Sequence, residues 1–246
     1  MTAAATPFLA RAERFASVGS TNDVVRAWLR EGTPEVCLAV ADEQTAGRGR
    51  RGTTWASPAG AGLYLSFIAK PFAKNVSLIT LAAGVAVRDG IASATGLAPD
   101  LKWPNDVIVG RRKLAGILAE GLAIGAPDQV VVIGVGINVQ PASYPPDVAA
   151  RATSLEGELG RRVDRGLVLA DVLVQLWDRL ALLEQKPGDI LQAWRAASPN
   201  AAGTRVEWDG GHGVTAGIDD SGALLVKTST GVERIIAGEL SWHLGT

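Results

Sequence analysis

The chain has few of the residue types that most often build covalent active sites or multi-ligand metal sites. Among its 246 residues there is one cysteine, Cys37, and there are two histidines, His212 and His243. A single cysteine excludes a disulfide within the chain and a zinc site made of several cysteines. Cys37 lies in a short apolar run that predicts a buried strand, so its sulfur is expected to be an inert core group and not a nucleophile.

An excess of charge of either sign is also missing. The 24 basic residues nearly balance the 25 acidic ones. This balance disfavours bulk electrostatic binding to nucleic acid or to an anionic membrane surface, so any basic function must reside in a few residues. No apolar run of membrane-spanning length is apparent, and residues 1–10 lack the features of a signal peptide. We therefore predict a cytoplasmic protein with no nucleic-acid or membrane partner.

The apolar and turn-forming residues predict an α+β fold. Caps and apolar periodicity favour helices at about 20–32, 77–95, 164–184 and 188–197. Strand-forming runs occur near 36–41, 62–69, 101–103, 106–109, 113–120 and 129–139. Past residue 203 only short strand runs separated by glycine turns remain, which is typical of a small antiparallel barrel. We expect a flexible lead-in (1–14), a large domain (15–199) and a small β domain (200–246).

What the chain does contain is a dense arginine–glycine segment. Residues 47–52 read Gly-Arg-Gly-Arg-Arg-Gly. Glycine lets the backbone approach a ligand closely, and guanidinium groups match carboxylate and phosphate oxygens two at a time. Alone, the segment would be interpreted as a solvated loop. Because glycines and solvated arginines bury little surface, residues 47–60 are expected to be mobile in the free protein and to close over a ligand.

Three further motifs change that interpretation. They are Lys-Trp-Pro-Asn-Asp at 102–106, Lys-Leu-Ala-Gly-Ile-Leu at 113–118 and Gly-Val-Gly-Ile-Asn at 134–138. With the arginine–glycine segment, they resemble the biotin–protein ligases, which activate biotin with ATP and attach it to a lysine. The resemblance is strong over residues 15–139 and weaker over 203–242.

The resemblance implies the class II synthetase-like catalytic fold of biotin and lipoyl ligases, a mixed or antiparallel sheet with packed helices, followed by a small SH3-like β-barrel. Some of these ligases carry an N-terminal helix-turn-helix domain that represses biotin genes. Only about fourteen residues precede the start of the resemblance, so the form without the repressor domain is expected.

The chemistry of such a ligase requires fixed cations. A carboxylate must first be adenylated by ATP, and the two reacting anions repel each other until cations neutralise them. Asp106 is expected to orient the incoming lysine amine in the second step, although Asn105 and Asp106 could also be turn residues after a proline. Neither histidine is placed for such a role. The candidate catalytic residues are Arg48, Arg50, Lys102, Asp106 and Lys113.

The resemblance also implies substrate-binding residues. Those for biotin are Ser20, Thr21, Asn22, Gln44, Gly47, Arg48, Gly49, Arg50, Lys113, Gly116, Leu118, Gly134, Gly136 and Ile137. Those for ATP are Arg50, Arg51, Trp55, Lys102, Asn105, Lys113 and Asn138, with Asn105 as a candidate ligand of Mg²⁺. The serine and threonine could equally be helix caps, the glycines and Ile137 ordinary sheet core, and Trp55 and Trp103 aromatic core.

The expected partner is a biotin carboxyl carrier domain of a biotin-dependent carboxylase, on another chain, and a homodimer is possible. Two alternatives stay open. A lipoate or octanoate ligase or transferase shares the fold but has neither this arginine–glycine segment nor the full set of motifs. A biotin sensor without catalytic activity would not need the lysines and the aspartate.

Overall fold

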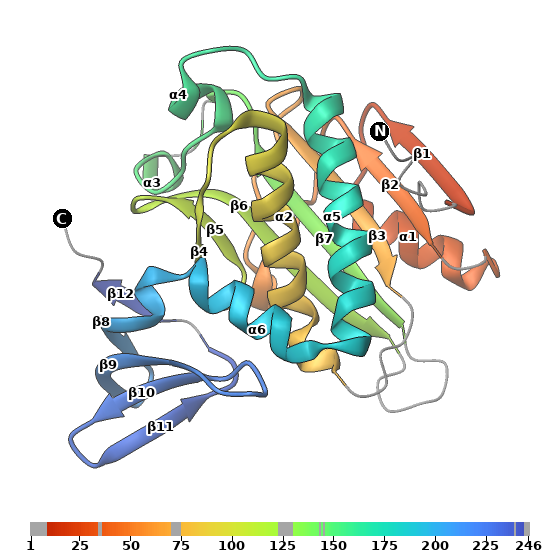
Figure 1. The fold of residues 1–246 in the computed structure, drawn as a ribbon. Helices are drawn as coiled ribbons and strands as arrows, with labels where there is room; N and C mark the ends of the chain where they lie inside the picture. The colour runs from red at the N-terminus through yellow and green to blue at the C-terminus, as the bar shows by residue number, and fades with distance from the viewer. Residues whose placement is uncertain are drawn as a thin grey trace.

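The computed structural model describes residues 9–33, 36–69, 75–122, 130–142, 144, 146–238 and 240–243 (Figure 1). Its larger part is a seven-stranded sheet in the order β1-β2-β3-β7-β6-β5-β4. The pairing of β1 with β2 is parallel and the other pairings are antiparallel, so the sheet is mixed, as predicted. The strands are β1 (Arg11–Phe15), β2 (Cys37–Ala41), β3 (Gly62–Ala69), β4 (Asp100–Lys102), β5 (Asp106–Val109), β6 (Arg112–Leu122) and β7 (Val130–Asn138).

The first strand corrects the predicted lead-in. Residues 11–15 pair along their whole length with 37–41, so the expectation of a flexible segment up to residue 14 is wrong for residues 11–14. Residues 1–8 lie outside the described residues. Residues 11–15 carry no strand signal because Arg-Ala-Glu-Arg-Phe is mostly polar, which is common for an edge strand exposed to water.

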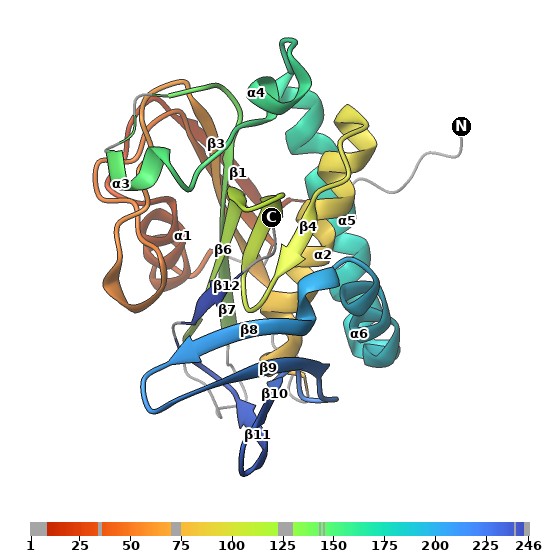
Figure 2. The same cartoon turned by 90° about the vertical axis from the view of Figure 1, so that its left-hand side faces the viewer.

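Helices cover both faces of this sheet (Figure 2). The face covered by α2 and α5 carries Leu38, Phe67 and Ile133, whereas the α1 face carries Cys37 and Val132. Successive side chains of each strand point to opposite faces of the sheet, and the apolar run of β7 is therefore buried on both sides. Cys37 is fully buried, as predicted. The helices are α1 (Thr21–Arg30), α2 (Ile79–Thr95), α3 (Pro146–Ala149), α4 (Leu155–Leu159), α5 (Arg165–Gln185) and α6 (Pro187–Ala196).

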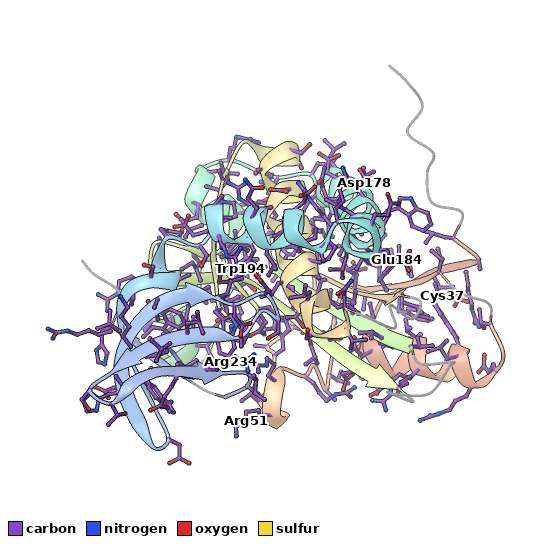
Figure 3. All side chains as sticks on the ribbon, turned by 60° about the horizontal axis from the view of Figure 1, so that its bottom comes forward. Cys37, Arg51, Asp178, Glu184, Trp194 and Arg234 are labelled. Atoms are coloured by element: carbon purple, nitrogen blue, oxygen red, sulfur yellow. The ribbon has the colours of Figure 1, made fainter. Side chains whose placement is uncertain are left out.

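The most apolar helix lies at the centre of this core. Residues Val76–Thr95 are long and apolar enough to cross a membrane, with a mean hydropathy of 1.4, so the expectation of no such run is wrong. In the folded chain 61% of that window is buried, and α2 packs against α5. Gly90 permits this contact, because a Cβ there would lie 2.6 Å from the Cα of Val172. Trp194 of α6 points into the same core, while Asp178 and Glu184 lie on the outer side of α5 (Figure 3).

The C-terminal part is a small antiparallel sheet in the order β11-β10-β9-β8-β12. It begins at residue 202, just past the predicted boundary, and its apolar residues belong to the same contiguous core as α2. Two hydrogen bonds also join the two parts: Trp103 Nε1 donates to Gly222 O (3.0 Å) and Leu101 N donates to Ala197 O (2.7 Å). The strands are β8 (Ala202–Trp208), β9 (Gly211–Ile218), β10 (Leu224–Thr228), β11 (Gly231–Ile235) and β12 (Ser241–His243).

Candidate active site

A cavity of about 1000 Å³ opens on the α1 side of the large sheet. Its lining comes from the start of α1, the arginine–glycine segment, the β4–β5 hairpin, and strands β6 and β7. The fold thus brings together motifs that lie up to about a hundred residues apart. All the predicted site residues line the cavity except Gly47 and Ile137.

One end of the cavity is a buried polar cluster. Thr21 donates from its backbone N (2.9 Å) and its hydroxyl (3.1 Å) to Gln44 Oε1, and Ser66 Oγ donates to Asn22 Oδ1 at 2.5 Å. Ser20 stands at the N-cap position of α1, but its side chain makes no capping hydrogen bond. Ser66 was not predicted, since a lone serine in an apolar strand carries no signal of its own.

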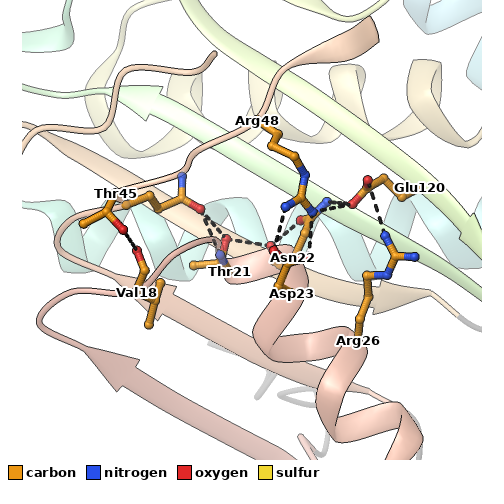
Figure 4. Close-up of polar contacts among 10 residues, drawn as sticks. Val18, Thr21, Asn22, Asp23, Arg26, Thr45, Arg48 and Glu120 are labelled. Carbon is orange, nitrogen blue, oxygen red and sulfur yellow. Dashed lines mark hydrogen bonds and ion pairs between the residues drawn. The ribbon is translucent and has the colours of Figure 1, made fainter. Parts of the chain in front are cut away.

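The Arg48 side chain belongs to a charged network beside this cluster (Figure 4). Its guanidinium donates two hydrogen bonds to Asp23 (2.6 and 2.8 Å) and lies 3.4 Å from Glu120 Oε2. Glu120 also accepts from Asn22 Nδ2 (2.6 Å) and lies 3.6 Å from Arg26. The hydrogen bond from Arg48 lowers the pKa of Asp23. Two carboxylates pair with Arg48 in this arrangement, and its predicted role as a cation for the reacting anions stays a prediction.

Three of the other predicted cations, Lys113, Lys102 and Arg50, converge on Asp106. Lys113 Nζ lies 2.6 Å from Asp106 Oδ1, and Lys102 Nζ lies 3.6 Å from Oδ2. The hairpin makes this geometry, because Lys102 is paired with Asp106 and Asp106 with Gly116. Arg50 is the third cation: burial lowers its pKa, and the charge of Asp106 partly offsets that effect. Three cations around one carboxylate leave positive charge in excess.

Two amide side chains hold the walls of the cavity together. Asn105 Nδ2 donates to Ile117 O (2.8 Å), which ties the hairpin to β6. Asn138 Nδ2 donates to Thr153 O (2.9 Å), which ties β7 to the segment before α4. Both residues line the cavity with their amide N–H groups already bound to backbone carbonyls.

The glycines of β6 and β7 make room for the indole of Trp55. A Cβ on Gly136 would lie 2.4 Å from Trp55 Nε1, and one on Gly116 would lie 3.0 Å from Trp55 Cζ3. Lys113 Nζ lies 5.1 Å from the centre of the same ring. Trp55 Nε1 is buried and has no hydrogen-bond partner within the described part of the chain. Gly134 instead faces Asn22, whose Oδ1 would lie 2.4 Å from a Cβ on the glycine.

Two predicted biotin residues lie elsewhere. Ile137 is fully buried in the core on the α2 face, because it alternates with Gly136 and Asn138, which face the cavity. The prediction that Ile137 forms the wall is therefore wrong. Gly47 does not line the cavity; a Cβ there would lie 2.5 Å from Trp55 O, so this glycine serves the folding of its own loop.

Comparison with known proteins shows the family of this chain. The family model described as Biotin/lipoate A/B protein ligase family matches residues 15–138, and that of the Biotin protein ligase C terminal domain matches 212–241. This chain belongs to the biotin/lipoate A/B protein ligase family. The resemblance seen in the sequence motifs is thereby confirmed.

Three relatives illustrate the similarity. The bifunctional ligase/repressor BirA of Bacillus subtilis is 35% identical over 91% of this chain and 71% of its own length. The biotin–[acetyl-CoA-carboxylase] ligase of Mycobacterium tuberculosis is 35% identical over 92% of this chain and 86% of its own. The structure of the biotin protein ligase from Aquifex aeolicus in complex with biotin and ATP superimposes with a TM-score of 0.83, at 29% identity, over 96% and 99% of the two chains.

In this member of the ligase family the C-terminal sheet also contributes to the cavity. Leu240, Ser241 and Trp242 line it, and Lys102 Nζ lies 5.8 Å from the centre of the Trp242 ring. Trp103 also lines the cavity, but it is buried and donates a hydrogen bond to Gly222, so it joins the two sheets, consistent with its interpretation as core. Sequence reasoning missed Trp242, which carries no motif and approaches Lys102 only after folding.

Tyr144 is another cavity residue without a sequence signal. Its hydroxyl is buried without a hydrogen-bond partner among the described residues, and burial raises its pKa.

Proposed function

We propose that this chain is an ATP-dependent biotin–protein ligase. It adenylates biotin to biotinyl-5′-AMP with release of pyrophosphate, and it then transfers biotin to a lysine of a carrier domain. The observation that carries this proposal is the group of Arg50, Lys102 and Lys113 around Asp106 at the wall of the cavity. The cavity volume of about 1000 Å³ suits a small acid together with a nucleotide.

In the first step a biotin carboxylate oxygen attacks the α-phosphorus of ATP, and the bond from that phosphorus to the leaving pyrophosphate breaks. Both reactants are anions, so the excess positive charge of the cluster lowers the barrier to their approach. Lys113 is best placed to bridge the carboxylate and the α-phosphate, since it reaches the cavity from β6 beside Gly116. Lys102 and Arg50 neutralise the phosphates.

In the second step the amine of an acceptor lysine attacks the acyl carbon of the adenylate, and AMP leaves. The amine arrives as an ammonium and must lose a proton before it attacks. Asp106 already accepts an ammonium at 2.6 Å, which supports a role in orienting a second one. A carboxylate gives no electrostatic help to two anions, so we assign Asp106 mainly to transfer.

The polar cluster and Trp55 define the proposed biotin end. Thr21, Asn22 and Gln44 present hydrogen-bonding groups to a cavity wall made of β6 and β7 glycines. The sequence predicted that Trp55 binds ATP, but we assign it to the biotin end of the cavity. Its indole lies on Gly116 and Gly136, between this cluster and Lys113. Its unpartnered Nε1 is a donor for a ligand in that position. The nucleotide is then placed towards Lys102 and Trp242.

Magnesium enters this proposal only with the nucleotide. Among the described residues there is no group of three or more His, Cys, Asp or Glu side chains that could hold a metal ion. Asn105 fits a single contact, since its Nδ2 is bound to Ile117 and its Oδ1 remains for a cation. Bound there with a triphosphate, Mg²⁺ would neutralise charge on the leaving pyrophosphate.

We further propose a biotin carboxyl carrier domain as acceptor and the cytoplasm, where ATP is supplied, as the compartment. A homodimer stays a prediction. The test is labelling of a purified carrier domain. With biotin, ATP and Mg²⁺ its mass should rise by one biotinyl group on one lysine, and lipoate or octanoate should give no product. Modification by lipoate or octanoate instead would favour the lipoate-ligase alternative, and binding of biotin without any product would favour the sensor.

A further inference from the structure

Residues 47–56 form a loop beside the cavity that is bonded mainly to itself. Gly49 N donates to Thr53 O (2.7 Å), and Trp55 N donates to Gly47 O (2.9 Å). The hydrogen bonds that the structure describes between this loop and another element are those of the Arg48 side chain. The indole of Trp55, which belongs to this loop, also packs against Gly116 and Gly136. The position of the loop over the cavity therefore depends on this packing and on what holds the Arg48 guanidinium.

Asp23 binds the Arg48 guanidinium with better geometry than Glu120 does. Its two carboxylate oxygens accept from the two terminal nitrogens of Arg48, at 2.6 and 2.8 Å, which is the bidentate arrangement of strong arginine–carboxylate pairs. Glu120 is farther away, at 3.4 Å, and it is shared with Asn22 and Arg26. Asp23 lies in the first turn of α1, directly after the residues proposed to bind biotin, and it does not line the cavity itself.

We propose that Asp23 is a positioning residue for the reaction: by fixing Arg48 it keeps the 47–56 loop closed, so that biotinyl-adenylate is retained until the acceptor arrives. This inference rests on the proposed function. Retention matters because an acyl-adenylate that escapes into water is hydrolysed. A closed loop prevents both the escape and the hydrolysis. Sequence motifs do not indicate it, since Asp23 falls in none of them.

The exposure of the pair sets how strong this closure is. The side chain of Asp23 is 56% exposed and that of Arg48 is 33% exposed, so water and salt screen the attraction. We expect loss of the pair to speed release of the adenylate about fivefold, which corresponds to ~1 kcal/mol. A closure of this strength permits opening for the acceptor lysine.

The test compares Asp23→Asn with wild type in two measurements on the full chain. The first is the dissociation rate of preformed biotinyl-adenylate, measured after a chase with unlabelled biotin and ATP. The second is the single-turnover rate of adenylation at saturating substrates. We expect release to be about fivefold faster and adenylation to change less than twofold. Added salt should accelerate release from wild type more than from the variant.

Matched variants separate this role from a general effect on α1. Asp23→Glu keeps the carboxylate and should restore slow release. Glu31→Gln breaks another arginine–carboxylate pair at the far end of the same helix, that with Arg11 at 3.3 Å, and should leave release unchanged. Equal release from Asp23→Asn and wild type, or faster release from Glu31→Gln as well, would overturn the proposal.

Limited trypsin digestion without ligands reads the loop directly. Cleavage after Arg50 or Arg51 should be faster in Asp23→Asn than in wild type and Glu31→Gln. This readout needs no catalysis. If the wild-type chain formed no biotinyl-adenylate, the proposed function would fail, while the digestion would still decide on the loop: equal cleavage rates would reject the role of Asp23.

Discussion

Replacing Lys113 by methionine tests the proposed centre of the reaction most sharply. Methionine keeps an unbranched apolar stem beside Trp55 and removes only the ammonium. The Lys113 side chain is about a third exposed, and Asp106 keeps Lys102 at 3.6 Å, so screening limits the loss of folding free energy to about 1 kcal/mol or less. The chain should therefore fold. The loss of one cation that bridges two reacting anions should raise the barrier by about 2–4 kcal/mol, or slow adenylation by about 10²–10³-fold.

The assay is single-turnover formation of biotinyl-adenylate at saturating biotin and ATP. Transfer is measured separately, from preformed adenylate to a carrier domain. Lys113→Arg, which keeps the charge at a similar reach, should recover part of the adenylation rate. Lys227→Met is a matched control, because that lysine is exposed on β10, away from the cavity. If Lys113→Met slowed only transfer and left adenylation at the wild-type rate, the bridging role would be refuted.

Three further predictions follow from single contacts. Asp106→Asn should slow transfer much more than adenylation in the same two assays, and equal losses would mean that it acts through the structure of the site. Gly136→Ala should raise the KM for biotin at least tenfold by displacing the facing indole, whereas Gly84→Ala, with 3.7 Å of clearance, should leave it unchanged. Burial alone would raise the pKa of Asp219, but hydrogen bonds from Ser221 and Arg234 outweigh it and hold that pKa at about 2. This pKa lies below the pKa of the same carboxyl in the unfolded chain. Wild type should therefore lose up to about 2 kcal/mol of unfolding free energy as the pH falls from about 4 to 2. Asp219→Asn should lack that loss, and Asp220→Asn should keep it.

The sequence motifs predicted residues that the fold brings together at one cavity, because each motif is a local signal with a chemical reason. The pairing of Lys102 with Asp106 follows from their spacing in a tight hairpin, and glycines in β6 and β7 do mark a close approach. The sequence could not show which side chain approaches these glycines. That the indole of Trp55 fills this space depends on how the loop folds back, which no spacing encodes.

The wrong predictions and the missed contacts have similar physical causes. Arg48 was expected to act with the other arginines of its segment, and the sequence could not show that Asp23 and Glu120 contact it from two other elements. Ile137 was assigned to the cavity with its motif, although the alternation of a strand sends it to the opposite face. The strand at residues 11–15 was missed because an edge strand needs little apolar surface.

The proposed function requires that the chain activates biotin as an adenylate before any acceptor is present. Isotope exchange between pyrophosphate and ATP measures this step alone. With purified chain, ATP, Mg²⁺ and labelled pyrophosphate, label should enter ATP when biotin is added and not when lipoate or octanoate replaces it. Absence of biotin-dependent exchange in a folded chain that binds biotin would contradict the account.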